Sequence, residues 1–139
     1  MRLTIEKVLL LKSVAMLADT PDHILAELAS ILTEISVSSG ETIVKEGEIG
    51  TSMYIIIDGK IGVYRNNKKL AILGNREVFG ELAALSPEAR TATIVAEEDT
   101  QLFRLDQEAL HEFMGQYIEV AIGIINVLCQ RLREQFQSK

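Results

Sequence analysis

A glycine, a carboxylate and an arginine lie close together between residues 79 and 93, and these residue types can hold a sugar and a phosphate group side by side. Gly80 lets the backbone approach a ligand where any Cβ would clash. Glu81 can accept hydrogen bonds from a diol, and Arg90 offers a planar fork of donors to phosphate. The segment therefore predicts a pocket for a nucleotide.

Each of these residues also has an ordinary structural explanation. An isolated Gly80 would be a turn glycine, and Arg90 could be an ion-paired surface residue. Glu81 could stabilise the first turn of a short helix that begins near Leu82. Thr91 could bond a ligand or simply open a strand. Because the residues stand together in one short segment, the ligand-binding interpretation is favoured.

The composition narrows the class of protein. A chain of 139 residues is expected to form one domain whose core needs no disulfides. The single cysteine, Cys129, excludes an internal disulfide framework, and a cytoplasmic setting is the simplest expectation. A net charge of -6 opposes general nucleic-acid binding, for which a basic surface supplies most of the affinity. No run approaches the ~20 apolar residues that cross a bilayer, so we expect no membrane insertion by this chain.

The hydrophobic pattern divides the chain into helical ends and a strand-rich middle. Apolar residues recur at helical spacing in 3–11 and 21–32. From 33 to 105, short β-branched or aliphatic runs alternate with turns, and Asp58-Gly59 predicts a hairpin. Evenly spaced short strands of this kind predict an antiparallel jelly roll or β-roll with flanking helices rather than a parallel sheet.

Helical spacing returns at Asp106, which can cap a segment that Gly115 is expected to end or bend. Residues 117–137 are predicted to form the longest helix. This helix carries two adjoining apolar stripes, whereas a helix that rests on a barrel needs only one. The stripes are Ile118, Ile122, Ile125, Cys129, Leu132 and Phe136, and Val120, Ile124, Val127 and Leu128. The surplus stripe predicts a partner surface, for a homodimer or a neighbouring domain, or a lid over the ligand.

The segment 79–93 resembles the phosphate-binding cassette of the cyclic nucleotide-binding domain family, which includes regulatory subunits of cAMP-dependent protein kinase, the catabolite activator protein and cyclic-nucleotide-gated channels. The residues that carry the resemblance are Phe-Gly-Glu-Leu-Ala at 79–83 and Arg-Thr-Ala-Thr at 90–93. The glycine-punctuated stretch 46–64 is similar to the family as well, so the resemblance covers most of the chain.

The resemblance implies an antiparallel β-roll, or double-stranded β-helix, followed by the family's B and C helices. One domain would span 1–139, with N-terminal helices in 1–32, the β-roll in 33–105 and C-terminal helices in 106–137. The ligand would be a cyclic purine mononucleotide, cAMP or cGMP. The resemblance assigns its binding to Gly80, Glu81, Leu82, Ala83, Arg90 and Thr91.

By resemblance, Glu81 accepts the ribose 2′-hydroxyl, and the backbone N–H groups of Ala83 and Ala84 join Arg90 at the phosphate. Thr91 would bond the phosphate or, as in some cGMP-responsive members, the guanine amino group. Three apolar residues are expected near the base: Val63, Ile72 and Leu73.

Two positions depart from the family pattern. Proline often directly precedes the cassette arginine, whereas this chain has Ala89 there and its proline at Pro87. Many members have a bulky aliphatic residue, which contacts the C-terminal helix, where this chain has Ala84. The loop path and the coupling to the helix are therefore expected to differ from the family pattern more than the binding residues do.

The favoured interpretation is a non-catalytic sensor module that binds cAMP or cGMP and repositions its C-terminal helix. The alternative is an interaction or dimerisation domain that keeps the fold without sensing a nucleotide. A metal-dependent enzyme such as a cupin is disfavoured, because no histidine falls between 33 and 105 and no metal site is expected. Transcription factors of the family carry a helix-turn-helix after the long helix. Since the sequence ends at Lys139, the chain itself is not expected to bind DNA.

Overall fold

The computed structural model describes residues 2–86 and 88–137. Their side chains are described except at Leu82, Ala83 and Glu88. The described residues form two compact units. The β unit runs from Leu32 to Leu110, and the helical unit combines residues up to Ile31 with those from His111 onward. The prediction of one domain over 1–139 stays a prediction.

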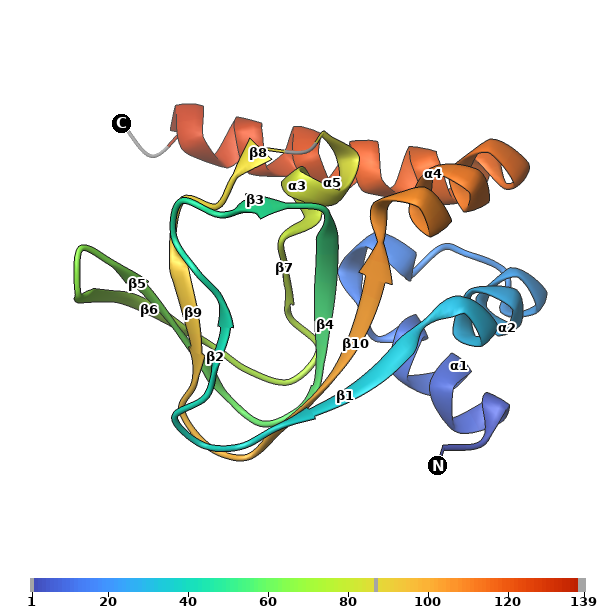
Figure 1. Cartoon of the computed structure of the whole chain (residues 1–139). Coiled ribbons are helices and arrows are strands. Elements are labelled where there is room, and N and C mark those ends of the chain that lie inside the picture. The colour runs from blue at the N-terminus through green and yellow to red at the C-terminus, as the bar shows by residue number, and fades with distance from the viewer. Residues whose placement is uncertain (1, 87, 138–139) are drawn as a thin grey trace. The chain divides into compact units, whose positions relative to one another are not determined.

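The β unit contains short strands and one short helix (Figure 1). Its elements are β1 Thr33–Val37, β2 Thr42–Val44, β3 Ile49–Gly50, β4 Ser52–Asp58, β5 Ile61–Arg65, β6 Lys68–Leu73, β7 Val78–Phe79, α3 Glu81–Leu85, β8 Glu88–Ala89, β9 Thr93–Ala96 and β10 Thr100–Asp106. The strands pair antiparallel in the orders β1-β10-β4-β7, β2-β9-β5-β6 and β3-β8. This is the antiparallel β-roll that the sequence predicts.

The two larger sheets wrap around a common interior (Figure 1). The strand β4 is buried along nearly its whole length, and it pairs with β10 at one edge and with β7 at the other. Both sheets contribute to one cluster of buried residues, which consists of Val37, Tyr54, Ile56, Ile61, Phe79, Ile94, Ala96 and Leu102. Burial of these apolar side chains is the main force that closes the roll.

The predicted hairpin at Asp58-Gly59 is wrong, because the strands on either side enter different sheets. Gly59 has a φ of 131°, and a Cβ there would lie 2.3 Å from the Thr100 Oγ1 atom. The glycine therefore lets the chain cross from one sheet to the other. A hairpin instead joins β5 to β6 at Asn66-Asn67, where both residues have positive φ, as a type I′ turn requires.

The helical unit contains α1 Thr4–Lys12, the 3-10 turn η1 Ala15–Leu17, α2 Asp22–Ile31 and α5 Ile118–Gln137. The helix α4, Gln107–Gln116, begins in the β unit and continues into the helical unit. The chain bends by 113° between α4 and α5. The predicted end or bend of the helix at Gly115 is wrong, because Gly115 lies inside α4. The break between the two helices falls at Tyr117.

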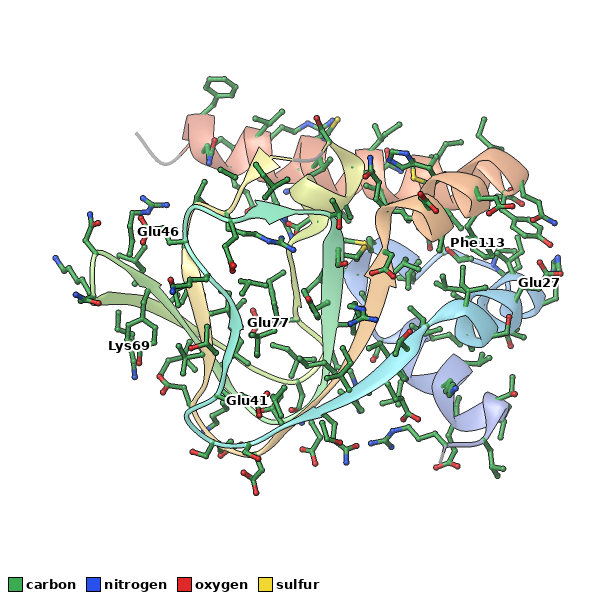
Figure 2. The ribbon with its side chains drawn as sticks, viewed as in Figure 1. Glu27, Glu41, Glu46, Lys69, Glu77 and Phe113 are labelled. Atoms are coloured by element: carbon green, nitrogen blue, oxygen red, sulfur yellow. The ribbon has the colours of Figure 1, made fainter. Side chains whose placement is uncertain are left out.

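Tyr117 is fixed at this bend by two contacts within the helical unit. Its hydroxyl donates a hydrogen bond to the Glu27 carboxylate, which raises the pKa of Tyr117. Its ring packs against Phe113 with centroids 5.0 Å apart. Glu27 and Phe113 are labelled in Figure 2. The bend is therefore set by contacts of Tyr117 with α2 and α4 rather than by the flexibility of a glycine.

The helix α5 is apolar on two faces, as predicted. Val120 and Ile124 are buried. At Gly123, α5 packs so closely against η1 that a Cβ would lie 2.4 Å from the Met16 carbonyl oxygen. The other stripe is exposed at Ile118, Ile122, Ile125, Leu132 and Phe136. In the part of the chain that the structure describes, no single helix is long and apolar enough to cross a membrane; the bent pair α4–α5 passes that test by length and composition only.

A polar cluster ties the β5–β6 hairpin to the segment after β9. The Lys69 ammonium forms an ion pair with Glu97 and lies 5.7 Å from the centre of the Tyr64 ring. The Tyr64 hydroxyl donates to Glu97 Oε1 at 3.1 Å. Figure 2 shows Lys69 on the projecting hairpin. The hydrogen bond between Lys69 and Glu97 lowers the pKa of the Glu97 carboxyl and raises the pKa of Lys69.

This cluster predicts a pH window for hairpin order. Because the pKa of Glu97 is lowered from 4.5, its contribution is complete above pH 4.5 and is lost as the pH falls through the lower folded value. The pKa of Lys69 is raised from 10.5, so its contribution is complete below pH 10.5 and is lost at higher pH. Amide exchange corrected for intrinsic rates should show constant protection of β5 and β6 between these limits and a loss on acidification. The Glu97→Gln variant should show a smaller acid loss than wild type; an unchanged acid loss would contradict the assignment.

Candidate functional site

The segment 79–93 borders a cavity of about 260 Å³ in the β unit. Four residues predicted for the site line it: Gly80, Glu81, Arg90 and Thr91. The remaining walls are mostly apolar and come from Val44, Val63, Val78, Phe79, Ala89, Ala92 and Ile94. A concave, largely apolar site with a few convergent polar groups is the usual form of a small-molecule site.

Gly80 occupies a position that only glycine fits. It follows β7, where the Phe79 ring stacks on Tyr54 with centroids 4.9 Å apart. Its φ is 81°, and a Cβ would lie 2.7 Å from the Ser52 carbonyl oxygen and 2.8 Å from Arg90 Nη1. The helix α3 then begins directly at Glu81, whose side chain is only 9 % exposed. Gly80, which has no side chain, and the buried Glu81 are therefore neighbours in the lining of the cavity.

Arg90 is held by its backbone and by its side chain. Its N–H donates to the Glu48 carbonyl at 2.7 Å, and its own carbonyl accepts from the Gly47 N–H at 2.9 Å. The guanidinium Nη2 donates to the Ser52 carbonyl at 2.8 Å. Within the described residues the guanidinium makes no other hydrogen bond, so donors remain for an anion in the cavity.

Thr91 and Thr93 have different surroundings. Thr91 lines the cavity but lies before β9, so the expectation that it opens a strand is wrong. Its carbonyl accepts from Arg65 Nε at 3.0 Å. Thr93 belongs to β9, and its hydroxyl accepts from the Glu46 N–H at 3.0 Å. The Thr91 side chain is therefore the one of the two that a ligand could reach.

The other predicted positions are only partly described. Leu82 and Ala83 lie in α3, with side chains outside the described part, and Pro87 lies outside the described residues. The Ala84 N–H donates to the Gly80 carbonyl at 3.1 Å, so in this conformation that donor is already used within the helix. The Ala84 side chain is fully buried.

One of the three apolar residues expected near the base lines the cavity. Val63 contributes to its wall. Ile72 is 53 % exposed, and Leu73 packs against the core cluster. Neither is among the residues around the cavity. The strand β6 lies at the edge of its sheet, which explains the exposure of Ile72.

Two residues that hold the arginine were missed by sequence reasoning, Gly50 and Ser52. They line a second hollow of about 180 Å³ that also includes Arg90. The sequence from Gly47 to Gly50 predicts a turn, because two glycines lie close together. In the structure Gly50 instead belongs to the two-residue strand β3. Ser52 accepts a hydrogen bond from Arg90 through its backbone carbonyl. Every residue type has this group, so the sequence does not indicate the contact. Among the described residues, no group of three or more His, Cys, Asp or Glu is suited to a metal ion.

An antiparallel β-roll with a glycine, a buried glutamate and an arginine around one cavity has the features typical of a small-molecule-binding domain. The model of the family described as "Cyclic nucleotide-binding domain" matches residues 34–117, which include every predicted site residue. The chain belongs to this family.

Two relatives come from different classes of protein. The chain is 36% identical over 94 residues to a cGMP-dependent protein kinase of Toxoplasma gondii, covering 67% of this chain and 10% of the kinase. It is 31% identical over 114 residues to a CRP-like cAMP-activated global transcriptional regulator of Mycobacterium tuberculosis, covering 78% of this chain and 51% of the regulator. The chain thus spans about half of one relative and about a tenth of the other.

A solved structure shares the fold. The N-terminal domain of a transcriptional regulator from Streptomyces coelicolor A3(2) aligns with a TM-score of 0.82 at 28% identity, covering 94% of each chain.

The crowding around Gly80 predicts a substitution effect that a matched glycine separates from backbone strain. Gly47 also has positive φ, at 91°, but nothing lies within 4 Å of a Cβ there. Gly47→Ala should lower the free energy of unfolding by about 1–2 kcal/mol, the cost of a left-handed alanine. Gly80→Ala should cost a further ~1–3 kcal/mol, because the methyl group meets the Ser52 carbonyl and Arg90. Equal losses in urea unfolding would contradict the close packing of Arg90.

Proposed function

We propose that the β unit binds a cyclic purine mononucleotide, cAMP or cGMP, as a non-catalytic sensor. The observation that carries the proposal is the meeting of Gly80, Glu81 and Arg90 around one cavity, with guanidinium donors left for an anion. Membership of the cyclic nucleotide-binding domain family and relatives named for cAMP and for cGMP support it.

Each predicted residue has a proposed role. Arg90 binds the cyclic phosphate through paired N–H donors, and Glu81 accepts the ribose 2′-hydroxyl. Gly80 lets the sugar approach the backbone. Thr91 bonds the phosphate or the guanine amino group, so it is the residue at which cAMP and cGMP would be distinguished. Leu82 and Ala83 complete the proposed site from α3.

The proposal includes a change of position of the C-terminal helix when the nucleotide binds. A ligand favours one helix position only if its contacts differ between the two states. A cytoplasmic location, inferred from the single cysteine, is part of the same proposal.

Calorimetric titration with cAMP and with cGMP tests the proposal. Saturation at 100 times the dissociation constant should raise the free energy of unfolding by about 2.7 kcal/mol. Arg90→Ala should weaken binding by about 1.5–3 kcal/mol, because a charge-assisted hydrogen-bond partner of the phosphate is lost. Arg133→Ala, an exposed arginine on α5, is the control and should bind normally. Absence of heat and of a thermal shift with both nucleotides at millimolar concentration would refute nucleotide binding.

We also propose that α5 pairs with α5 of a second copy of the chain. One stripe follows the positions 118, 122, 125, 129, 132 and 136, which alternate in steps of four and three, and all of these residues except the half-buried Cys129 are exposed. This mean spacing of 3.5 residues is that of a left-handed coiled coil. The pairing is compatible with a sensor and also with the alternative, an interaction domain that does not respond to nucleotide.

Substitution within the stripe tests this pairing. Ile125→Asp places a charge at the centre of the stripe and should convert dimers to monomers in sedimentation experiments, because an unpaired buried charge is costly. Gln130→Glu adds a charge to α5 outside the stripe and should leave the dimer intact. A wild-type chain that is monomeric at all concentrations, with and without nucleotide, would contradict the pairing. A dimer that ignores both nucleotides would favour the interaction domain over the sensor.

A further inference from the structure

The guanidinium of Arg90 rests directly on the backbone of Gly50. A Cβ at Gly50 would lie 2.1 Å from Arg90 Nε and 2.3 Å from Arg90 Cζ. These distances are far below any real contact, so even alanine would displace the guanidinium. Gly50 does not need glycine for its backbone angles, since its φ is not positive. The requirement for glycine at this position is the space that the arginine occupies.

The next two residues fix both the arginine and the start of α4. The Ser52 carbonyl accepts from Arg90 Nη2 at 2.8 Å, while the Ser52 hydroxyl donates to Asp106 Oδ1 at 2.6 Å. The Thr51 carbonyl accepts from the Gln107 N–H at 2.8 Å. Asp106 ends β10 and Gln107 begins α4. All of these contacts lie within the β unit.

Ser52 therefore contacts two groups directly, in addition to the backbone bonds that hold β4 beside the end of β10. One is the arginine on the cavity wall, and the other is the first turn of a helix that continues out of the β unit. The Ser52 carbonyl and hydroxyl belong to one residue. If the guanidinium moves and the carbonyl follows it, the Ser52 hydroxyl, which is bonded to Asp106, moves as well. The ladder between β4 and β10 pairs Ser52 with Asp106 in register, so the connection is short.

We propose that Gly50 and Ser52 are positioning residues for Arg90, and that the Ser52 hydroxyl couples the position of the guanidinium to the first turn of α4. The role of the Ser52 hydroxyl in a response to ligand rests on the proposed nucleotide binding. The coupling between Arg90 and α4 does not require a ligand. The contact between Ser52 and Arg90 is polar, and both residues line the second hollow.

The coupling is tested first in the protein without ligand. The exchange rate of the Gln107 amide is the readout, because its acceptor is the Thr51 carbonyl. Arg90→Ala should accelerate this exchange by about threefold to tenfold, the factor for one ordinary hydrogen bond. Arg65→Ala is the matched control, since Arg65 also donates to a backbone carbonyl, and it should change the rate by less than about twofold.

The same substitution is then repeated in the Ser52→Ala background. If the hydroxyl carries the coupling, Arg90→Ala should now change Gln107 exchange by less than about twofold. An equal effect of Arg90→Ala with and without the hydroxyl would overturn the proposal, as would no effect in the wild-type background. These outcomes do not depend on whether the chain binds a nucleotide.

A second arm tests positioning with cAMP and cGMP. Gly50→Ala should weaken nucleotide binding by at least about tenfold, because the displaced guanidinium loses a charge-assisted bond to phosphate. Gly74→Ala is the control, since its φ is also not positive and a Cβ there would only touch the Gly59 carbonyl at 4.0 Å. Ser52→Ala should bind within about threefold of wild type but lose the nucleotide-dependent change in Gln107 exchange.

The two arms separate the two ideas. A wild-type chain that binds neither nucleotide refutes the proposed function and leaves the ligand-free result to decide the coupling. The Arg90 Nη2–H resonance provides a ligand-free check on positioning, because this group donates to the Ser52 carbonyl. It should be protected from exchange in wild type and in Gly74→Ala, and unprotected in Gly50→Ala. Protection retained in Gly50→Ala would overturn the role of Gly50.

Discussion

The site depends on the space that the backbone leaves for one guanidinium group. A planar cation of this size needs room on its faces and hydrogen-bond acceptors at its edges. The backbone provides both. Gly50 and Gly80 leave room for the group because they lack a Cβ, and the Ser52 carbonyl accepts one of its N–H groups. The strands β3, β4, β7 and β8 are arranged so that these backbone positions converge. The β-roll can thus be understood as the scaffold that brings two separate backbone segments, residues 50–52 and Gly80, around one side chain.

Much of this could be predicted from the sequence. Glycine, glutamate and arginine in one short segment indicated a sugar and phosphate site, and the structure brings Gly80, Glu81, Arg90 and Thr91 to one cavity. The antiparallel β-roll and the two-faced final helix follow from periodicity, because long regular patterns average over local exceptions. Binding of a nucleotide by these residues remains a prediction.

The errors have a common physical origin. Asp58-Gly59 is a turn, but whether the strands beside a turn pair with each other is decided by distant partners, and here they enter different sheets. The strands β3 and β8 have two residues each, which is too short for any alternation to be visible. Ser52 contributes its carbonyl to the arginine, and carbonyl groups are the same in every residue. Local sequence therefore identifies the chemistry of the cassette but not the backbone that supports it.

The backbone bonds of Arg90 have a consequence for the order of folding. Its N–H and carbonyl are joined to Glu48 and Gly47, residues that are far away along the chain, through a two-stranded sheet with few contacts of its own. Closure of such a long loop is entropically unfavourable until the flanking strands are already in place. The arginine should thus reach its final position late, after the buried cluster has formed. Partly folded chains would then lack the complete site, and only fully folded molecules would be competent to bind.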